Sequence, residues 1–519
     1  MNATQEQAVR RKSDQLAYLW LIIGAVLLLF ANGKWIAPIA TWLFPVFFIH
    51  FMRPQKSAWH ILICAIVYAS VFCIAWQGMI PFPGILYYVV ASGLGLIFFL
   101  PFLIDKILAP RLRGFIATLV FPLAYTSFEY IGFQFTPFGT WGSLAYTQYG
   151  NLPLMQIVSI TGIYGLTFLI TWFAAVVNWA WEQQFDWSKI STGIKIYVGV
   201  FVAALLYGSM YLVFLSPQSN VVKIAGVQSG LGKTLLESEY EWFYDGDVTK
   251  ANWDSIISKN KIVIDDLFLK SEMAAKGGAK IVAWAEASAL VPKEGEPAFI
   301  ERGKQLAQQE QIYLEMSYSA ILHTDLTLLP ENKMWENKVV FITPSGDVLP
   351  QYRKTILVPG LEAMLAVKGN DDAPMINTPY GRLSALICYD NDFPSFVREK
   401  VGKAGADLLI DPSGDWEDID PYHTNMVAFR AVENGFSVMR VTYQGLSAAY
   451  DYQGRTLATM DYFRTDDKIL TAQVPEKGMT TTYTKIGDVF AWLCVVGFIT
   501  ITGLAVIRKR KSDTALQRI

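Results

Sequence analysis

The stretch Arg382-Leu383-Ser384-Ala385-Leu386-Ile387-Cys388-Tyr389-Asp390 places a single thiol at the end of an apolar, strand-like run. The other cysteines, Cys64, Cys73 and Cys494, lie in apolar segments long enough to span a membrane. The polar region around Cys388 therefore has one thiol and cannot form an internal disulfide. Cys388 is either a buried core residue or a nucleophile.

The composition indicates a membrane protein with a separate polar domain. The chain has 519 residues, of which 53% are hydrophobic and 14% aromatic, and its mean hydropathy is +0.30. This length exceeds that of one ordinary domain. The formal net charge of -2 argues against nucleic acid as a partner. The sequence has no glycine-rich phosphate loop and no Cys/His cluster with metal spacing, so neither a metal nor an organic cofactor is implied.

Long apolar runs predict eight membrane-spanning helices, because roughly 17–25 apolar residues suffice to cross a bilayer. Seven of them precede residue 217, and their approximate ranges are 16–33, 35–52, 58–80, 85–104, 114–133, 153–181 and 195–215. The eighth lies near 486–507. The first run follows basic residues but has a weak cleavage context, so we interpret it as a retained helix and not as a signal peptide.

The distribution of basic residues predicts the orientation, since loops rich in lysine and arginine stay in the cytoplasm. Basic residues collect around 10–12, 53–56, 106–113 and 189–195 and in the tail 508–511, whereas the short loops of the other side hold only Lys34. We expect both termini in the cytoplasm and residues 217–485 outside it. Glu129 is the clearest charge within the spans, and such charges are too few to favour a transporter.

Residues 221–476 follow a different pattern, in which short β-rich runs alternate with amphipathic helices. The runs 280–286, 350–358 and 381–389 are among the predicted strands, and the ranges 252–276 and 422–434 are among the predicted helices. This region is an α/β domain of ample size for a core. The pattern alone does not identify which α/β fold it adopts.

Three segments of this domain carry polar residues suited to catalysis. Glu286 ends an apolar strand, Lys354 lies in Gln351–Glu362, and Cys388 ends the run quoted above. A thiol nucleophile needs a base, and an acyl intermediate needs a cation or N–H groups for its oxyanion. Each residue also has an ordinary alternative: a solvated turn for Glu286, a surface charge for Lys354, and a core position for Cys388.

The combination resembles the carbon–nitrogen hydrolase (nitrilase) superfamily, which uses a Glu-Lys-Cys triad in this order on an α-β-β-α sandwich. Spans arranged seven-plus-one around such a domain look like the apolipoprotein N-acyltransferase family of bacterial envelopes. The resemblance covers nearly the whole chain. Besides the triad segments, it rests on Pro137-Phe138-Gly139, Gly162-Ile163-Tyr164-Gly165 and Pro421-Tyr422-His423 with Arg430–Asn434.

The resemblance implies a role for five residues. Glu286 would be the general base, Lys354 would stabilise the tetrahedral oxyanion, and Cys388 would be the acylated nucleophile. Glu362 matches the family's supporting glutamate, and Tyr389 matches the aromatic residue beside the nucleophile.

The chain departs from the family pattern near the site. It has Gly360-Leu361-Glu362 where Phe-Gly-Glu is usual, and Cys388-Tyr389-Asp390 where Cys-Tyr-Glu is usual. Ser229-Gly230 and Ser413-Gly414-Asp415-Trp416 also differ. No departure removes a triad residue, and all of them flank the predicted site.

The resulting expectation is a multi-span helical membrane domain (1–216), an extracytoplasmic nitrilase-like α-β-β-α sandwich (217–485), and a C-terminal helix with a basic tail (486–519). The resemblance implies acyl transfer from a membrane phospholipid, through a Cys388 thioester, to the α-amine of a lipoprotein's lipidated N-terminal cysteine. We expect a monomer in the bacterial inner membrane. The alternatives are a membrane-tethered amidase or nitrilase, which shares the triad, and a catalytically idle scaffold or transporter.

Two apolar segments are candidates for guiding a lipid to Cys388. The loop 134–142 carries Phe135, Phe138 and Trp141, which are either interfacial anchors or part of a lipid site. The segment 360–367 carries Leu361, Met364 and Leu365 and predicts a mobile apolar lid. We expect a cleft bounded by these segments, open toward the membrane and ending at Cys388.

Overall fold

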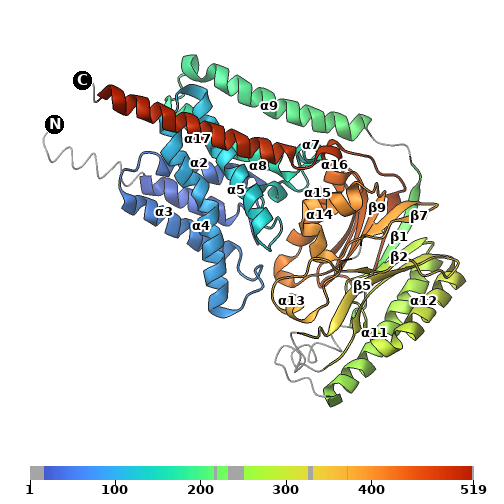
Figure 1. The fold of residues 1–519 in the computed structure, drawn as a ribbon. Helices are drawn as coiled ribbons and strands as arrows, with labels where there is room; N and C mark the ends of the chain where they lie inside the picture. The colour runs from blue at the N-terminus through green and yellow to red at the C-terminus, as the bar shows by residue number, and fades with distance from the viewer. Residues whose placement is uncertain (1–16, 216–218, 232–249, 325–330, 371, 517–519) are drawn as a thin grey trace. The chain divides into compact units, whose positions relative to one another are not determined.

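The computed structural model describes residues 17–215, 219–231, 250–324, 331–370 and 372–516 (Figure 1). Its internal contacts divide the chain into two compact units. The first unit comprises residues up to Thr136, Trp141–Phe214 and the segment from Ile486 onward, and the second comprises Pro137–Thr140 and Leu215–Lys485. The short Pro137–Thr140 segment, which the sequence places between two helices of the first unit, therefore groups with the second.

The first unit is helical, and its apolar helices pack through aromatic side chains. Phe44, Phe48, Tyr68 and Phe102 form one buried ring cluster, with centroid separations from 5.3 to 6.4 Å. The larger helices are α2 (Pro38–Met52), α3 (Ala58–Ala75), α4 (Gly84–Leu108), α5 (Val120–Phe135), α8 (Ile163–Glu182), α9 (Trp187–Phe214) and α17 (Val489–Leu516).

Six helices among the described residues are long and apolar enough to cross a membrane, so the chain is an integral membrane protein. Six of the eight predicted spans coincide with these helices, and eight crossings stay a prediction. The first two predicted spans contain shorter apolar helices in their described residues, Ala17–Leu29 and α2, and Gly33 lies between them with a φ of +119°. The predicted span 153–181 divides at Gly162, whose φ is +61°.

The second unit contains two sheets in its described residues. The first has the order β13 (Ile469–Pro475), β1 (Val221–Val227), β2 (Ile281–Trp284), β4 (Tyr313–Ile321), β5 (Trp335–Ile342) and β6 (Tyr352–Arg353), with β3 (Leu290–Pro292) on β4. The second has the order β12 (Thr456–Asp461), β11 (Leu446–Tyr450), β10 (Ser437–Tyr443), β9 (Leu408–Gly414), β8 (Gly381–Ala385) and β7 (Ile376–Thr378).

The sheets face one another and helices cover their outer faces. A Cβ on Gly226 of β1 would lie 2.7 Å from Val441 and 3.0 Å from Met439 of β10, so the backbones approach closely at this glycine. α11 (Lys250–Lys276) and α12 (Glu296–Glu310) lie along the first sheet, and α14 (Pro394–Val397) and α15 (Tyr422–Asn434) lie beside the second (Figure 1). The expected α-β-β-α sandwich is confirmed.

Two predicted strands are shorter than expected, and both differences shape the site. The run 350–358 forms strand only at Tyr352–Arg353, which leaves Lys354 at a strand end. The run 381–389 is strand only to Ala385, after which a 3-10 turn covers Cys388–Asp392. The polar side chains at 388–390 therefore belong to a turn, not to the alternating faces of a strand.

Candidate active site

Cys388 begins the turn that follows β8. Its φ of +50° lies in the left-handed region, which is unusual for a residue with a side chain. Its backbone N–H donates to Asp411 Oδ1 at 3.1 Å, and its Sγ lies 3.8 Å from the carbonyl oxygen of Gly414. The side chain is buried, with 4% of the residue exposed. The sharp turn thus presents the thiol to the end of β9.

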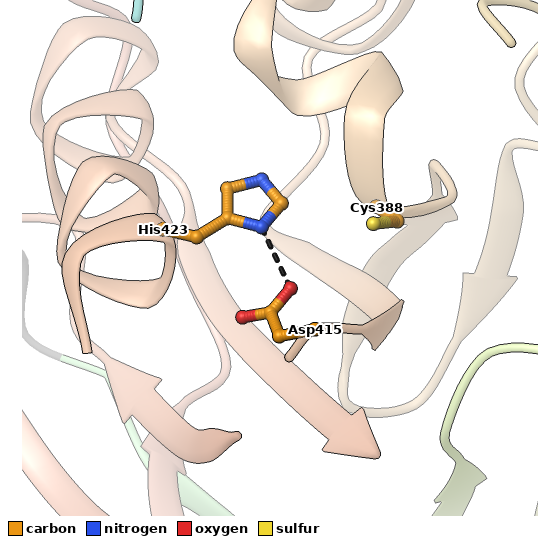
Figure 2. Close-up of side chains that lie close together, drawn as sticks. All are labelled: Cys388, Asp415 and His423. Atoms are coloured by element: carbon orange, nitrogen blue, oxygen red, sulfur yellow. Dashed lines mark hydrogen bonds and ion pairs between the residues drawn. The ribbon is translucent and has the colours of Figure 1, made fainter. Parts of the chain in front are cut away.

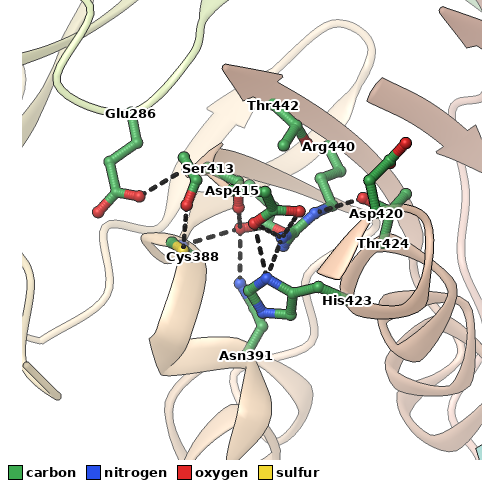
Figure 3. Close-up of polar contacts among 12 residues, drawn as sticks. Glu286, Cys388, Asn391, Ser413, Asp415, Asp420, His423, Thr424, Arg440 and Thr442 are labelled. Carbon is green, nitrogen blue, oxygen red and sulfur yellow. Dashed lines mark hydrogen bonds and ion pairs between the residues drawn. The ribbon is translucent and has the colours of Figure 1, made fainter. Parts of the chain in front are cut away.

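Glu286 lies just beyond the end of β2 and contacts the same part of β9. Its Oε2 accepts a hydrogen bond from Gly414 N–H at 2.8 Å, and its backbone N–H donates to the Ser413 carbonyl. Gly414 therefore contacts the glutamate through its N–H and the thiol through its carbonyl. Figure 3 shows Glu286 and Cys388 near Ser413 at this strand end.

Lys354 forms ion pairs with two glutamates. Its Nζ donates to Glu286 Oε1 at 2.8 Å and to Glu362 Oε2 at 3.0 Å. Only 1% of Lys354 is exposed. Burial opposes its positive charge, but the carboxylates of Glu286 and Glu362 outweigh burial and hold the pKa of Lys354 well above its usual value. The amine is therefore a fixed cation at this site.

Glu362 is positioned by the short helix α13 (Leu361–Leu365). The preceding Gly360 has a φ of +106°, so the departure from the family pattern supplies a glycine where the backbone needs one. Glu362 Oε2 also accepts from Val358 N–H at 2.7 Å, which closes the loop between Lys354 and α13.

Asn337 connects the two glutamates, and the sequence analysis missed it. Its Nδ2 donates to Glu286 Oε1 at 2.7 Å and to Glu362 Oε1 at 3.2 Å. Its backbone carbonyl accepts from Lys354 N–H at 2.9 Å. The one signal for it was a small amide in β5 among charged and apolar neighbours, which is a weak signal in a sequence.

Asp390 and Tyr389 secure the turn that begins at Cys388. Asp390 Oδ2 accepts from the Tyr352 hydroxyl at 2.7 Å, and its Oδ1 accepts from Ile356 N–H at 2.7 Å. Burial raises the pKa of Asp390 to about 7 against these hydrogen bonds. The Tyr389 hydroxyl donates to the Pro137 carbonyl. Asp390, which replaces the family's usual glutamate, thus connects the turn at Cys388 to the segment that contains Lys354.

A buried charged cluster lies on the other side of the cysteine turn; we call it the Arg440 cluster, and it comprises Asp392, Asp411, Asp415, His423 and Arg440. Arg440 donates to Asp411 at 2.6 Å and to Asp415 at 3.2 Å, and its guanidinium is fully buried (Figure 3). His423 lies between Asp415 (2.7 Å) and Asp392 (3.0 Å). Burial disfavours its charge, but these carboxylates raise the pKa of His423 to about 9.

The sequence analysis assigned no role to this cluster, although a signal was present. Arg440 interrupts the apolar strand Val438-Met439-Arg440-Val441, and Asp411 interrupts Leu408-Leu409-Ile410 in the same way. A charge in a buried strand needs a partner. The parallel register pairs these two residues directly across β9 and β10.

Cys388, Asp415 and His423 carry thiol, carboxylate and imidazole groups that could hold a metal, and their ligand atoms lie within 4.8 Å of one another (Figure 2). The geometry favours a hydrogen-bonded pair instead. His423 Nδ1 and Asp415 Oδ1 are 2.7 Å apart, which is a hydrogen-bond distance and closer than two ligands of one tetrahedral zinc. A protonated His423 beside Arg440 would also repel a cation.

The surroundings of the thiol determine its resting protonation. Burial raises the pKa of the Cys388 thiol well above its usual value, and Glu286 raises it further, while Lys354 and Arg440 lower it. The thiol is therefore neutral at rest and has a carboxylate nearby and a cation on each side. Such a site can pass the thiol proton to Glu286 as sulfur attacks an acyl carbon.

The segment 360–367, which was predicted to form a lid, exposes only some of its apolar side chains. Met364 is 60% exposed and Leu361 is 37% exposed, but Leu365 is buried, and the lid stays a prediction. The Leu365 carbonyl accepts from Met334 N–H at 2.8 Å, and Val367 N–H donates to Trp335, which fixes the end of α13 to β5. The proposed cleft, with Phe135, Phe138 and Trp141, stays a prediction.

Both units of the chain match models of known protein families. The family model for carbon–nitrogen hydrolases matches residues 235–483, and the model for the apolipoprotein N-acyltransferase N-terminal domain matches residues 23–176. An amidase from Nesterenkonia sp. is a similar solved structure, with 20% identity, a TM-score of 0.40, and coverage of 53% of this chain and 96% of that chain.

Curated relatives match across both units. The apolipoprotein N-acyltransferase of Geobacter metallireducens is 28% identical over 424 residues, which cover 76% of each protein. That of Rickettsia typhi is 24% identical over 398 residues, which cover 73% of this chain and 75% of the relative. With both domain models matched in order, the chain belongs to the apolipoprotein N-acyltransferase family.

Proposed function

We propose that this protein transfers an acyl chain from a membrane phospholipid to the α-amino group of a lipoprotein's lipidated N-terminal cysteine. The observation that carries the proposal is the buried Glu286–Lys354 ion pair beside Cys388, in a chain whose relatives are apolipoprotein N-acyltransferases. The spans suit substrates that are both anchored in the bilayer by acyl chains.

In the first half-reaction Glu286 accepts the thiol proton while Cys388 Sγ attacks the ester carbonyl of the phospholipid. The tetrahedral oxyanion is stabilised by the Lys354 ammonium. The backbone N–H of Tyr389 makes no hydrogen bond to another described residue and is a second candidate donor. When the carbon–oxygen bond breaks, Glu286 returns the proton to the lysophospholipid and a thioester remains on Cys388.

In the second half-reaction the neutral α-amine of the lipoprotein attacks the thioester carbonyl. Glu286 accepts the amine proton, Lys354 again stabilises the oxyanion, and the carbon–sulfur bond breaks. The proton passes from Glu286 to the cysteine sulfur, so the enzyme returns to its starting state. The cycle balances without a cofactor, an oxidant or a metal.

The orientation proposal does not depend on the two helices that are shorter than expected. Five helices long enough to cross lie between the basic residues at 53–56 and Leu215. An odd number of crossings puts residues 215–485 on the side opposite that basic loop, as seven crossings would. We therefore propose an inner-membrane protein with its catalytic domain outside the cytoplasm. A monomer suffices, since one chain supplies all the proposed catalytic groups.

Mass spectrometry of the enzyme purified from membranes tests the proposal. We expect an acyl adduct on Cys388 that is released when a diacylated lipopeptide with a free amine is added. Cys388→Ser and Cys388→Ala should lose turnover while still folding and inserting. Retained activity in either variant would exclude Cys388 as the nucleophile. Release of the adduct by water as fast as by the lipopeptide would favour the amide hydrolase instead.

A further inference from the structure

The backbone of Cys388 is held in a conformation that it would not adopt unaided. A left-handed φ is unfavourable for a residue with a side chain, and such residues persist only where neighbouring contacts hold them. The contacts here converge on Asp411. Its Oδ1 accepts from Cys388 N–H at 3.1 Å, from Asn391 Nδ2 at 2.9 Å and from Ser413 Oγ at 3.3 Å. One carboxylate oxygen thus ties the cysteine turn to β9.

The other oxygen of Asp411 is held by Arg440. Arg440 Nη1 donates to Asp411 Oδ2 at 2.6 Å, and both side chains are fully buried. Arg440 is itself fixed by Asp415 and by Thr424 Oγ1, which accepts from Nε at 3.0 Å. The two oxygens of Asp411 therefore have separate donors: the nucleophile's backbone on one side and the arginine on the other.

We propose that Arg440 and Asp411 form a positioning pair for the nucleophile, in which Arg440 orients the carboxylate of Asp411 and Asp411 holds the backbone of Cys388. The proposal rests on the proposed function only in taking Cys388 as the reacting group. The direction of the backbone at Cys388 sets where Sγ points. Sγ faces the carbonyl oxygen of Gly414, and the N–H of the same glycine donates to Glu286. A turn released from Asp411 would move the thiol away from its base.

A purely structural ion pair would predict a different pattern of mutant effects. In Asp411→Asn the single amide oxygen is drawn to the Arg440 guanidinium, so the amide NH₂ faces the Cys388 N–H and the two donors oppose each other. In Asp411→Asn with Arg440→Met the amide is free to turn its oxygen back to Cys388. The positioning pair therefore predicts that the second mutation rescues the first, whereas a structural role predicts that it adds damage.

The experiment measures the rate of Cys388 alkylation by iodoacetamide in the full-length enzyme in detergent, followed by peptide mass spectrometry and normalised to folded protein. Acylation by a water-soluble p-nitrophenyl ester is measured in parallel. We expect Asp411→Asn to slow both reactions about 100-fold, since a misplacement of about 1 Å can cost that factor. We expect kcat to fall with KM unchanged. The double variant should recover to within about tenfold of wild type.

Asp407→Asn is the matched control. Asp407 Oδ2 accepts from Arg382 N–H at 2.8 Å near the start of β8, so Asp407 holds a backbone amide before Cys388 as Asp411 holds that of Cys388 itself. In Asp407→Asn the rate of Cys388 alkylation should stay within about twofold of the wild-type rate, because Cys388 keeps its own contacts. A loss equal to that of Asp411→Asn would show a general effect on the sheet and overturn the proposal.

Arg440→Lys keeps the test decisive if Asp411→Asn fails to fold. Lysine retains a cation for Asp411 but cannot also reach Asp415 with a planar fork. A rate of Cys388 alkylation in Arg440→Lys within about threefold of the wild-type rate supports the positioning role of the pair, because Asp411 stays oriented. A wild-type rate for Asp411→Asn, or a double variant worse than the single one, refutes it. Alkylation reports on the turn even if no phospholipid acylates Cys388, so failure of the proposed function would be recognised separately.

Discussion

Replacing each of the two glutamates that contact Lys354 separates the proposed base from its supporting neighbour. Glu286 accepts three hydrogen bonds, from Lys354, Asn337 and Gly414, and Glu362 also accepts three, from Lys354, Asn337 and Val358. Glu286→Gln and Glu362→Gln therefore remove the same kind of charge from the same lysine. They differ in that only Glu286 touches the β9 end that faces the thiol.

The size of each effect follows from these contacts. A glutamine has one oxygen, so in either variant the NH₂ group faces at least one donor, and Lys354 keeps a single carboxylate. The loss of a hydrogen bond to a charged group costs about 1.5–3 kcal/mol, and this cost is shared by both variants. Loss of a general base costs a further 10²- to 10⁴-fold in rate, or about 3–5 kcal/mol of barrier, and applies to Glu286→Gln alone.

The assay is the rate of thioester formation on Cys388 from a phospholipid, with unfolding of both variants followed in the same detergent. We expect similar losses of stability and thioester formation at least about 100-fold slower in Glu286→Gln than in Glu362→Gln. Equal rates in the two variants would refute the assignment of Glu286 as the base. A larger loss in Glu362→Gln would exchange the two roles.

Three further outcomes are expected. Met364→Asp should impair acylation by a phospholipid far more than acylation by a short water-soluble ester, because Met364 is 60% exposed on α13; equal loss with both donors would count against a lipid-guiding lid. His423→Gln should destabilise the enzyme most below pH 6.5, and the difference should shrink as the pH rises through about 9, since Asp392 and Asp415 raise the pKa of folded His423 above its ordinary 6.5 despite burial. A difference in unfolding free energy that does not change with pH would contradict this. Reporters active only in the cytoplasm should be inactive when fused after Leu215, and activity there would reverse the proposed orientation.

The sequence predicted the second unit better than the first, for physical reasons. Apolar runs that end in a polar residue indicated Glu286 and Cys388 as candidates, because the sheets bury β2 and β8. Lys354 follows Tyr352–Arg353, which is not an apolar run, and became a candidate through the family resemblance. Helix ends in the first unit depend on single residues, and apolar composition alone does not reveal that Gly162 adopts a positive φ.

The residues that were missed act through contacts distant in the chain. Asn337 lies 51 residues after Glu286 and 25 before Glu362, and its amide gains a role only when both glutamates are placed. Arg440 could have been suspected as a charge in an apolar strand, but its partner Asp411 lies 29 residues earlier. Pair register between β9 and β10 brings them together, and periodicity does not specify register for continuous buried strands.

The charge arrangement around Cys388 explains how a buried thiol can react without being ionised at rest. One ionic group, Glu286 with Lys354 and Glu362, lies beyond the end of β9, and the Arg440 cluster lies on the other side of the turn. Burial keeps the thiol neutral, so no anion is stored next to two carboxylates. In the proposed mechanism, proton transfer to Glu286 neutralises one carboxylate as the sulfur becomes negative, and the new anion then faces Lys354 and Arg440. The charge moves a short distance between groups that are already in place, which requires little reorganisation in a low-dielectric site.

The same burial bears on the choice between acyl transfer and hydrolysis. Cys388 is 4% exposed, so bulk water has little access to a thioester formed there. Exclusion of water protects a reactive acyl intermediate until an acceptor enters. A hydrolase would gain nothing from this protection, whereas an N-acyltransferase needs the thioester to persist while a membrane-anchored amine arrives. The long-lived adduct expected on Cys388 in the absence of a lipopeptide is therefore the property that distinguishes the two reactions on one triad.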